Sequence, residues 1–134
     1  MMKSYFILFI VFMISFHTYQ SYAQENVAGE TLWPFFNALK TGDTTKLLQY
    51  IDGPLQNRNK VLLQQNKNYS DLLKTKYEKA EFTINKISPI DNEKLVADIL
   101  IVTPRGNTIK RKLILNKKEG SNSWKIVDEI RSGM

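Results

Sequence analysis

The chain has 134 residues, no cysteine and a single histidine, His17. The missing thiols exclude disulfides, a cysteine nucleophile, thiolate metal ligands and lipid attachment through cysteine. A formal net charge of +6 arises from 19 Lys and Arg residues against 13 Asp and Glu residues, and it is spread along the chain without a dense basic run. This pattern favours a solvated lysine coat over a nucleic-acid-binding surface.

Residues 1–23 have the order of a secretory signal peptide. Lys3 precedes an apolar stretch from Tyr5 to Ile14, and Ser21-Tyr22-Ala23 offers a small-residue cleavage site. The apolar stretch is too short for a membrane span, which needs ~20 residues. We therefore predict a secreted or periplasmic protein whose signal peptide is removed. The remaining single domain, residues 24–134, contains neither histidine nor cysteine.

The first helical pattern covers residues 26–40, where apolar side chains recur at helical spacing and form one broad stripe. Pro34 lacks the N–H that an interior helical position would use. Either the helix begins near Leu32, with Pro34 in its first turn, or it is kinked at this proline. Asp43 then suits the N-cap of a second helix over residues 44–51.

A break at Asp52-Gly53-Pro54 leads into a third predicted helix. Pro54 suits its first turn, and the helix should extend to about residue 67. After an interruption, Ser70 caps a shorter helical segment that ends at Tyr77. The sequence thus predicts only helical segments before residue 80.

From Ala80 onward the apolar pattern changes from helical spacing to the alternation typical of strands. Turn-forming residues divide this region into four segments. Because short turns join these segments, we expect an antiparallel meander. Helices that precede such a meander pack on one face of it, so the predicted class is α+β, with N-terminal helices on a curved four-stranded antiparallel sheet. The strands are predicted around residues 82–84 and over 95–103, 108–116 and 124–130, with turns at 89–92, 104–107 and 117–123.

Two segments carry a family resemblance. Residues 32–43 read L-W-P-F-F-N-A-L-K-T-G-D, and residues 124–129 read W-K-I-V-D-E. In these segments and in the order of its elements, the chain resembles the NTF2-like superfamily, with its cone-shaped α+β fold of NTF2-like or cystatin-like type. It is most similar in style to small exported bacterial domains of the DUF4878 and lumazine-binding-like groups.

The resemblance implies a bent sheet wrapped by helices around a pocket, and it implies that two copies often pair through the sheet. It fixes no activity, because the superfamily includes dehydratases, isomerases, transport adaptors and domains with no known role. A shared fold cannot choose among these functions.

The mature domain offers few groups for metal binding or nucleophilic catalysis. It lacks the imidazole and thiol ligands that zinc and copper prefer. Asp91-Asn92-Glu93 lacks the glycine and the distal acid of a calcium loop. A serine close to a lysine, such as Ser88 near Lys86, is typical of an ordinary surface. We therefore expect no metal and no cofactor.

Asp128 is the strongest candidate for acid–base catalysis in an apolar pocket. Strand alternation places it on the same side as Trp124, and desolvation there would raise the pKa of its carboxyl group. Arg111 has the corresponding position on the preceding strand and could pair with Asp128, and Tyr50 could donate a hydrogen bond. The alternative is a structural Arg111–Asp128 ion pair at the rim of the sheet, which needs no substrate.

Trp33, Phe36, Phe82 and Trp124 are the candidates for the wall of a ligand pocket, although aromatic residues at these spacings also form ordinary cores. We expect a non-catalytic exported domain that binds a small apolar or amphipathic ligand or an envelope protein. Two alternatives stay open: a cofactor-free lyase or isomerase that uses a pocket carboxylate, and a homodimeric structural module. We expect no nucleic-acid partner and no membrane span after the signal peptide is cleaved.

Overall fold

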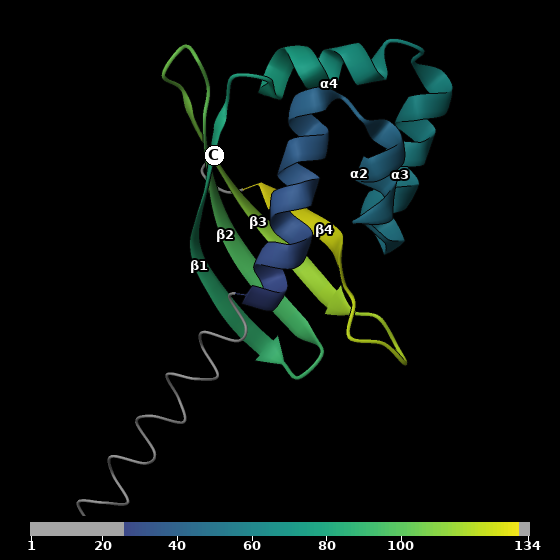
Figure 1. Ribbon diagram of the computed structural model, residues 1–134, viewed down its shortest axis with the longest axis vertical. Helices are drawn as coiled ribbons and strands as arrows, with labels where there is room; N and C mark the ends of the chain where they lie inside the picture. Colours follow the sequence, from purple (N-terminus) through teal and green to yellow (C-terminus); the bar gives the residue numbers. More distant parts are fainter. Residues whose placement is uncertain (1–25, 132–134) are drawn as a thin grey trace, which may run out of the picture.

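The computed structural model describes residues 26–131. Within this range, a layer of helices covers one face of a curved four-stranded antiparallel sheet (Figure 1). All described helices precede all strands in the chain, which confirms the predicted α+β class and the order of the elements. Residues 1–23, for which we predict a signal peptide, lie outside the described residues.

The N-terminal helix is continuous from residue 26 to residue 41 and passes through Pro34, so the predicted start near Leu32 is wrong. Proline removes the hydrogen bond that an N–H at this position would donate to the carbonyl of Glu30. The apolar stripe on either side of Pro34 packs against the sheet, and this tertiary packing outweighs the local preference. The buried apolar residues of the stripe are Ala28, Leu32, Phe35, Phe36 and Ala38.

Gly42 and Asp43 connect the N-terminal helix to the next one. Gly42 has a φ of 70°, and a Cβ there would lie 2.6 Å from the carbonyl oxygen of Ser70, so a larger residue would be both strained and obstructed. Asp43 caps α2 (Thr44–Gln49) by accepting a hydrogen bond from the backbone N–H of Lys46 at 3.1 Å. The predicted N-cap is therefore confirmed.

A short turn joins the third helix to the fourth. α3 covers Gly53–Gln65, with Pro54 in its first turn as predicted. α4 covers Tyr69–Tyr77. The predicted cap at Ser70 is wrong, because α4 begins at Tyr69 with Asn68 as its N-cap residue. Ser70 lies inside the helix, and its hydroxyl group donates to the carbonyl oxygen of Gly42. This bond ties α4 to the end of the N-terminal helix.

The sheet is a meander in which neighbouring strands are consecutive in sequence, as predicted. The first hairpin differs from the prediction, because the first strand continues through Pro89, where we expected a turn. Proline is tolerated there because this strand lies at the edge of the sheet. The strands are β1 (Glu81–Asp91), β2 (Lys94–Val102), β3 (Thr108–Lys117) and β4 (Trp124–Arg131).

One extra residue in β4 changes which side chains face the helices. In the register of β4 with β3, Val127 has no partner. Such a β-bulge shifts the alternation of the residues that follow it. Strand alternation predicted that Asp128 lies on the same face as Ile126. This prediction is wrong, because the bulge moves Asp128 off that face. Glu129 takes the inner face instead, opposite the buried Leu113.

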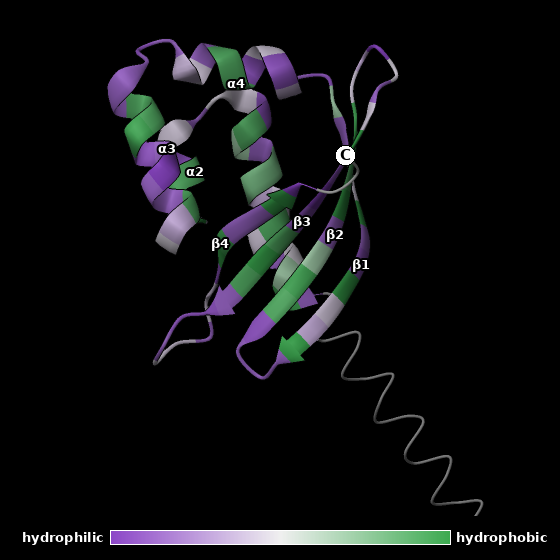
Figure 2. Cartoon of the chain, turned by 180° about the vertical axis from the view of Figure 1, so that it is seen from behind, coloured by the Kyte–Doolittle hydropathy of each residue, from purple (hydrophilic) through white to green (hydrophobic). Residues whose placement is uncertain are grey.

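The hydrophobic core lies between the inner face of the sheet and the helices. Along β2, buried and half-buried residues alternate without interruption, which confirms the strand alternation predicted for this segment. Figure 2 shows hydrophobic residues along the central strands β2 and β3 and hydrophilic residues in the turn between β1 and β2. The largest fully buried side chains are Leu32, Leu47, Ile51, Leu95, Leu115 and Ile126.

Candidate ligand-binding cavity

A cavity of about 570 Å³ lies between the inner face of the sheet and the helical layer. Every helix and every strand of the described chain contributes to its wall. Its volume falls within the range of small-molecule sites. Most of the wall consists of aliphatic and aromatic side chains. The charged side chains in the wall are Arg58, Lys76, Arg111, Glu129 and Arg131.

Two of the four aromatic residues predicted to line a pocket lie in this wall. Phe36 from the N-terminal helix stacks on Phe82 from β1, with ring centroids 4.6 Å apart and planes 16° from parallel. Trp33 contacts the edge of Phe36 from the outer side and is 52% exposed. Trp124 packs against the core at the other end of the sheet. The sequence pattern identified these aromatic residues but did not indicate which of them lie at the end of the sheet where the cavity is.

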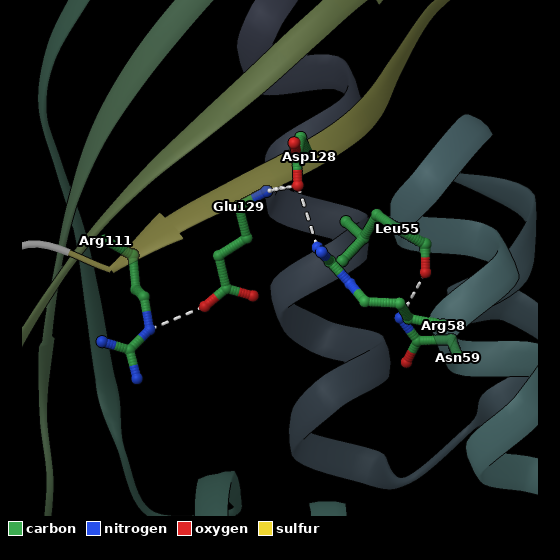
Figure 3. A network of polar contacts seen from close by, with 6 residues as sticks. All are labelled: Leu55, Arg58, Asn59, Arg111, Asp128 and Glu129. Carbon is green, nitrogen blue, oxygen red and sulfur yellow. Dashed lines mark hydrogen bonds and ion pairs between the residues drawn. The ribbon is translucent and has the colours of Figure 1, made fainter.

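Asp128 lies at an exposed rim beside α3. Its Oδ1 accepts hydrogen bonds from the backbone N–H of Glu129 at 2.8 Å and from Arg58 Nη2 at 2.9 Å (Figure 3). The backbone bond and then the Arg58 bond hold the pKa of Asp128 below its ordinary value of 3.8. The predicted rise in this pKa is therefore wrong, because the carboxylate has donors and solvent around it instead of an apolar surface.

Glu129 is the carboxylate that faces the cavity. Its Oε1 lies 2.6 Å from Arg111 Nε, and the side chains of Glu129 and Arg111 are only 30% and 14% exposed (Figure 3). The predicted pairing of Arg111 with Asp128 is wrong, because the bulge at Val127 moves the next residue of the chain into that place. The signal available in the sequence was the pair of consecutive acids, either of which could face inward.

Asn59 and Tyr69 form a second polar pair in the wall, which the sequence reasoning missed. Asn59 is buried, its Nδ2 donates to the carbonyl oxygen of Leu55 at 2.8 Å, and its Oδ1 accepts from the Tyr69 hydroxyl group at 2.7 Å. Burial, followed by the charges of Tyr77 and Glu129, raises the pKa of Tyr69. An amide one helical turn after the buried Leu55 was a detectable signal, because a polar residue on the inner stripe of a helix needs a partner.

Tyr50 does not lie in the cavity wall. It is the C-cap residue of α2, and its carbonyl oxygen accepts the backbone N–H of Ile126 at 2.9 Å. Its half-buried ring packs against the core. Asp128 is also absent from the described wall, so the structure does not bring Tyr50 and Asp128 together around a common space.

Within residues 26–131, no group of three or more His, Cys, Asp or Glu side chains has the arrangement of a metal site. In the same range, no helix has the length and hydropathy of a membrane-spanning segment. The cavity has the mostly apolar wall and the few polar groups that are typical of small-molecule sites.

No family model and no curated protein matches the sequence. Among solved structures, the chain is similar to a candidate NTF2-like transpeptidase from Campylobacter jejuni, with a TM-score of 0.52 and 18% sequence identity. The match covers 74% of this chain and 96% of the other. At this identity the likeness shows the fold alone. The arrangement of helices on a curved antiparallel sheet is thus an NTF2-like fold.

Proposed function

We propose that this NTF2-like domain is an exported, non-catalytic protein that binds one small, largely apolar molecule. The observation that carries the proposal is the cavity of about 570 Å³, to which every described element contributes. Protein interiors are normally filled by side chains to the density of organic crystals. A space whose wall is mostly apolar and is built from every described element supports a binding role.

Export is the second part of the proposal. It is supported by the charged, apolar and small-residue order of residues 1–23 and by the resemblance to exported DUF4878 and lumazine-binding-like domains. The protein would then bind its ligand or protein partner in the periplasm or outside the cell. Pairing of two copies through the outer face of the sheet belongs to the same proposal.

The polar groups of the wall support binding over catalysis. Glu129 is bonded to Arg111 at 2.6 Å, which makes it a poor general base. The described part of the wall contains no serine, threonine or cysteine to act as a nucleophile, as a transpeptidase of the serine or cysteine type would require. A lyase or isomerase that used Asp128 with Tyr50 would need both side chains in the wall, and neither is among the described wall residues.

A cavity-filling variant tests the proposal. Ile99 lines the cavity from β2, and the adjacent Leu100 points to the opposite face of the same strand. Ile99→Phe should weaken binding of the neutral apolar dye Nile red by about tenfold or more, because the ring occupies the space of the ligand. Leu100→Phe is the matched control and should bind the dye like the unmodified protein. Equal dye binding by all three proteins would contradict the proposal.

Native mass spectrometry of the protein purified from its own host adds an independent test. A co-purified small molecule of fixed mass, lost from Ile99→Phe and retained by Leu100→Phe, is the expected result. The same spectrum gives the subunit count and the mass of the mature chain. A mass that includes residues 1–23 would contradict the proposed cleavage of the signal peptide.

A further inference from the structure

The cationic side chains of the cavity wall are incompletely balanced by acids. Two of the four have carboxylate partners, and the other two have no ion-pair partner among residues 26–131. The pairs are Arg58–Asp128 and Arg111–Glu129. The cations without a described carboxylate partner are Arg131 and Lys76, whose Nζ lies 5.2 Å from the centroid of the Tyr77 ring. The described wall therefore carries an excess of positive charge.

Arg131 occupies a position where its charge is unfavourable. In the register of β3 with β4, Arg131 lies directly opposite Arg111, and both side chains line the cavity. Like charges at directly opposed positions destabilise a sheet. Glu129 offsets one of the two positive charges through its bond to Arg111 Nε, and no carboxylate among residues 26–131 pairs with the other. A negatively charged group bound beside the two arginines would remove this repulsion.

Arg111 has hydrogen-bond donors left for such a group. Its Nε bonds to Glu129 at 2.6 Å, and its Nη1 donates to the carbonyl oxygen of Lys110 at 3.1 Å. A guanidinium group carries about five N–H donors in a planar arrangement. The donors that remain suit a carboxylate or another planar or tetrahedral anion, which arginine recognises better than any other side chain.

The wall next to this charged end is apolar. Ile99 lies on β2 directly beside Arg111, and Leu113 is the next residue of β3 on the same face. The stacked rings of Phe36 and Phe82 belong to the same cavity. A hydrocarbon chain attached to an anionic group would therefore find an apolar surface immediately beside the arginines.

Tyr69 adds no negative charge to the cavity at neutral pH. Burial raises its pKa above the ordinary value of 10.0, so the hydroxyl group stays protonated, and its proton is donated to Asn59 Oδ1. An anionic ligand would thus meet a single carboxylate in the described wall, Glu129, and that carboxylate is already paired with Arg111.

From this arrangement we infer that the ligand is a single-chain amphiphile with an anionic head group, whose head lies beside Arg111 and Arg131 and whose chain lies against Leu113 and the two stacked rings. The inference rests on the proposed binding function and adds the chemical class of the ligand. A fatty acid, with a carboxylate on one hydrocarbon chain, is the simplest member of this class.

Three matched probes test the head-group charge on the purified protein. Decanoate, decanol and decyltrimethylammonium share one chain and differ in charge, and isothermal titration calorimetry measures the dissociation constant of each. Decanoate should bind about tenfold more tightly than decanol, because charge-assisted hydrogen bonds are stronger than neutral ones. The cationic probe should bind more weakly than decanol. Added salt should reduce the affinity for decanoate and leave that for decanol unchanged.

A variant assigns the effect to the proposed head-group site. Arg131→Gln removes a cation that has no described partner, so folding is not at risk, and it should weaken decanoate binding about fivefold without changing decanol binding. Lys74→Gln makes the same change of charge on α4 at an exposed position outside the wall, and it should leave both affinities unchanged.

The outcomes separate the inference from the function on which it rests. Equal affinities for decanoate and decanol in the unmodified protein would overturn the anionic head group and leave the binding function standing. A decanoate preference that survives Arg131→Gln in full would overturn the proposed position of the head. No binding of any of the three probes, together with no binding of Nile red, would overturn the proposed function itself.

Discussion

At one end of the inner sheet face, Leu95, Leu115 and Ile126 are at most 2% exposed beneath the helices. At the other end, Arg111 and Glu129 lie on the same face and line a cavity. Both ends use the same alternating pattern, and they differ in how completely the helices cover them. This small domain therefore has its tightly packed region and its open space at opposite ends of the same strands. Apolar residues are packed where the helices cover the sheet completely, and charged residues occur where the helices leave a space.

The largest expected effect compares two leucines of β3 that lie on the same face. Leu115 is 0% exposed at the filled end, and Leu113 lines the cavity. Leu115→Ala should lower the free energy of unfolding by about 3–5 kcal/mol, since it removes a side chain packed on all sides. Leu113→Ala should cost about 2 kcal/mol, because this side chain is also buried, at 4% exposed, but borders the cavity on one side instead of other side chains. Urea unfolding of both variants measures the difference, and equal losses would show that the two ends are packed alike.

The ion pair at the cavity end gives the next largest effect. Glu129→Gln leaves the mostly buried guanidinium group of Arg111 without its charged partner and should lower the free energy of unfolding by about 1–2 kcal/mol. The double variant Arg111→Gln with Glu129→Gln should recover part of this loss, because no unpaired charge remains. Chemical denaturation of the single and double variants checks this. A double variant less stable than the sum of the two single changes would contradict the pairing.

The order of the elements and the extent of most of them could be predicted from the sequence. Along β2, the predicted strand alternation is present throughout, with Leu95, Ala97 and Ile99 buried, because no residue interrupts the strand. The extent of the helix through Pro34 was predicted correctly, and the alternative start near Leu32 is wrong because the packing of the apolar stripe on the sheet is a tertiary effect. The order of the elements and the fold class depend on local patterns, and these patterns were sufficient to predict both.

The site could be predicted only in part, and β4 shows why. Alternation placed Asp128 on the inner face, while the bulge at Val127 gives that place to Glu129. A bulge depends on the register between two strands, which the sequence of one strand does not contain. The same limit applies to Phe36 and Trp124, since both are aromatic and only the placement of the helices decides that the first lines the cavity.

Outside the cavity, the pair of Arg58 and Asp128 should contribute much less than the pair inside. Both side chains are largely exposed, at 56% and 40%, so Asp128→Asn should cost about 0.2–1 kcal/mol at neutral pH. The pKa of Asp128 is lower in the folded chain than its ordinary value of 3.8, so this contribution is present above that value and is lost as the pH falls through the lower, folded pKa. Thermal unfolding from neutral to acidic pH should show the variant and the unmodified protein converging at the acidic end. A difference that grows on acidification would contradict the sign of the shift.

The smallest expected effect has the opposite sign and tests the charge excess at the cavity end most directly. Because Arg131 faces Arg111 across the two strands, Arg131→Gln should raise the free energy of unfolding by a few tenths of a kcal/mol at low salt. Salt screens the repulsion between the two arginines, so the gain should shrink as the ionic strength increases. Arg105→Gln in the exposed turn before β3 is the control for a general loss of positive charge and should change little. If Arg131→Gln instead lowered the stability, Arg131 would have a favourable partner in the free protein. The open end of the sheet would then be balanced in charge like the filled end, with no electrostatic reason to prefer an anion.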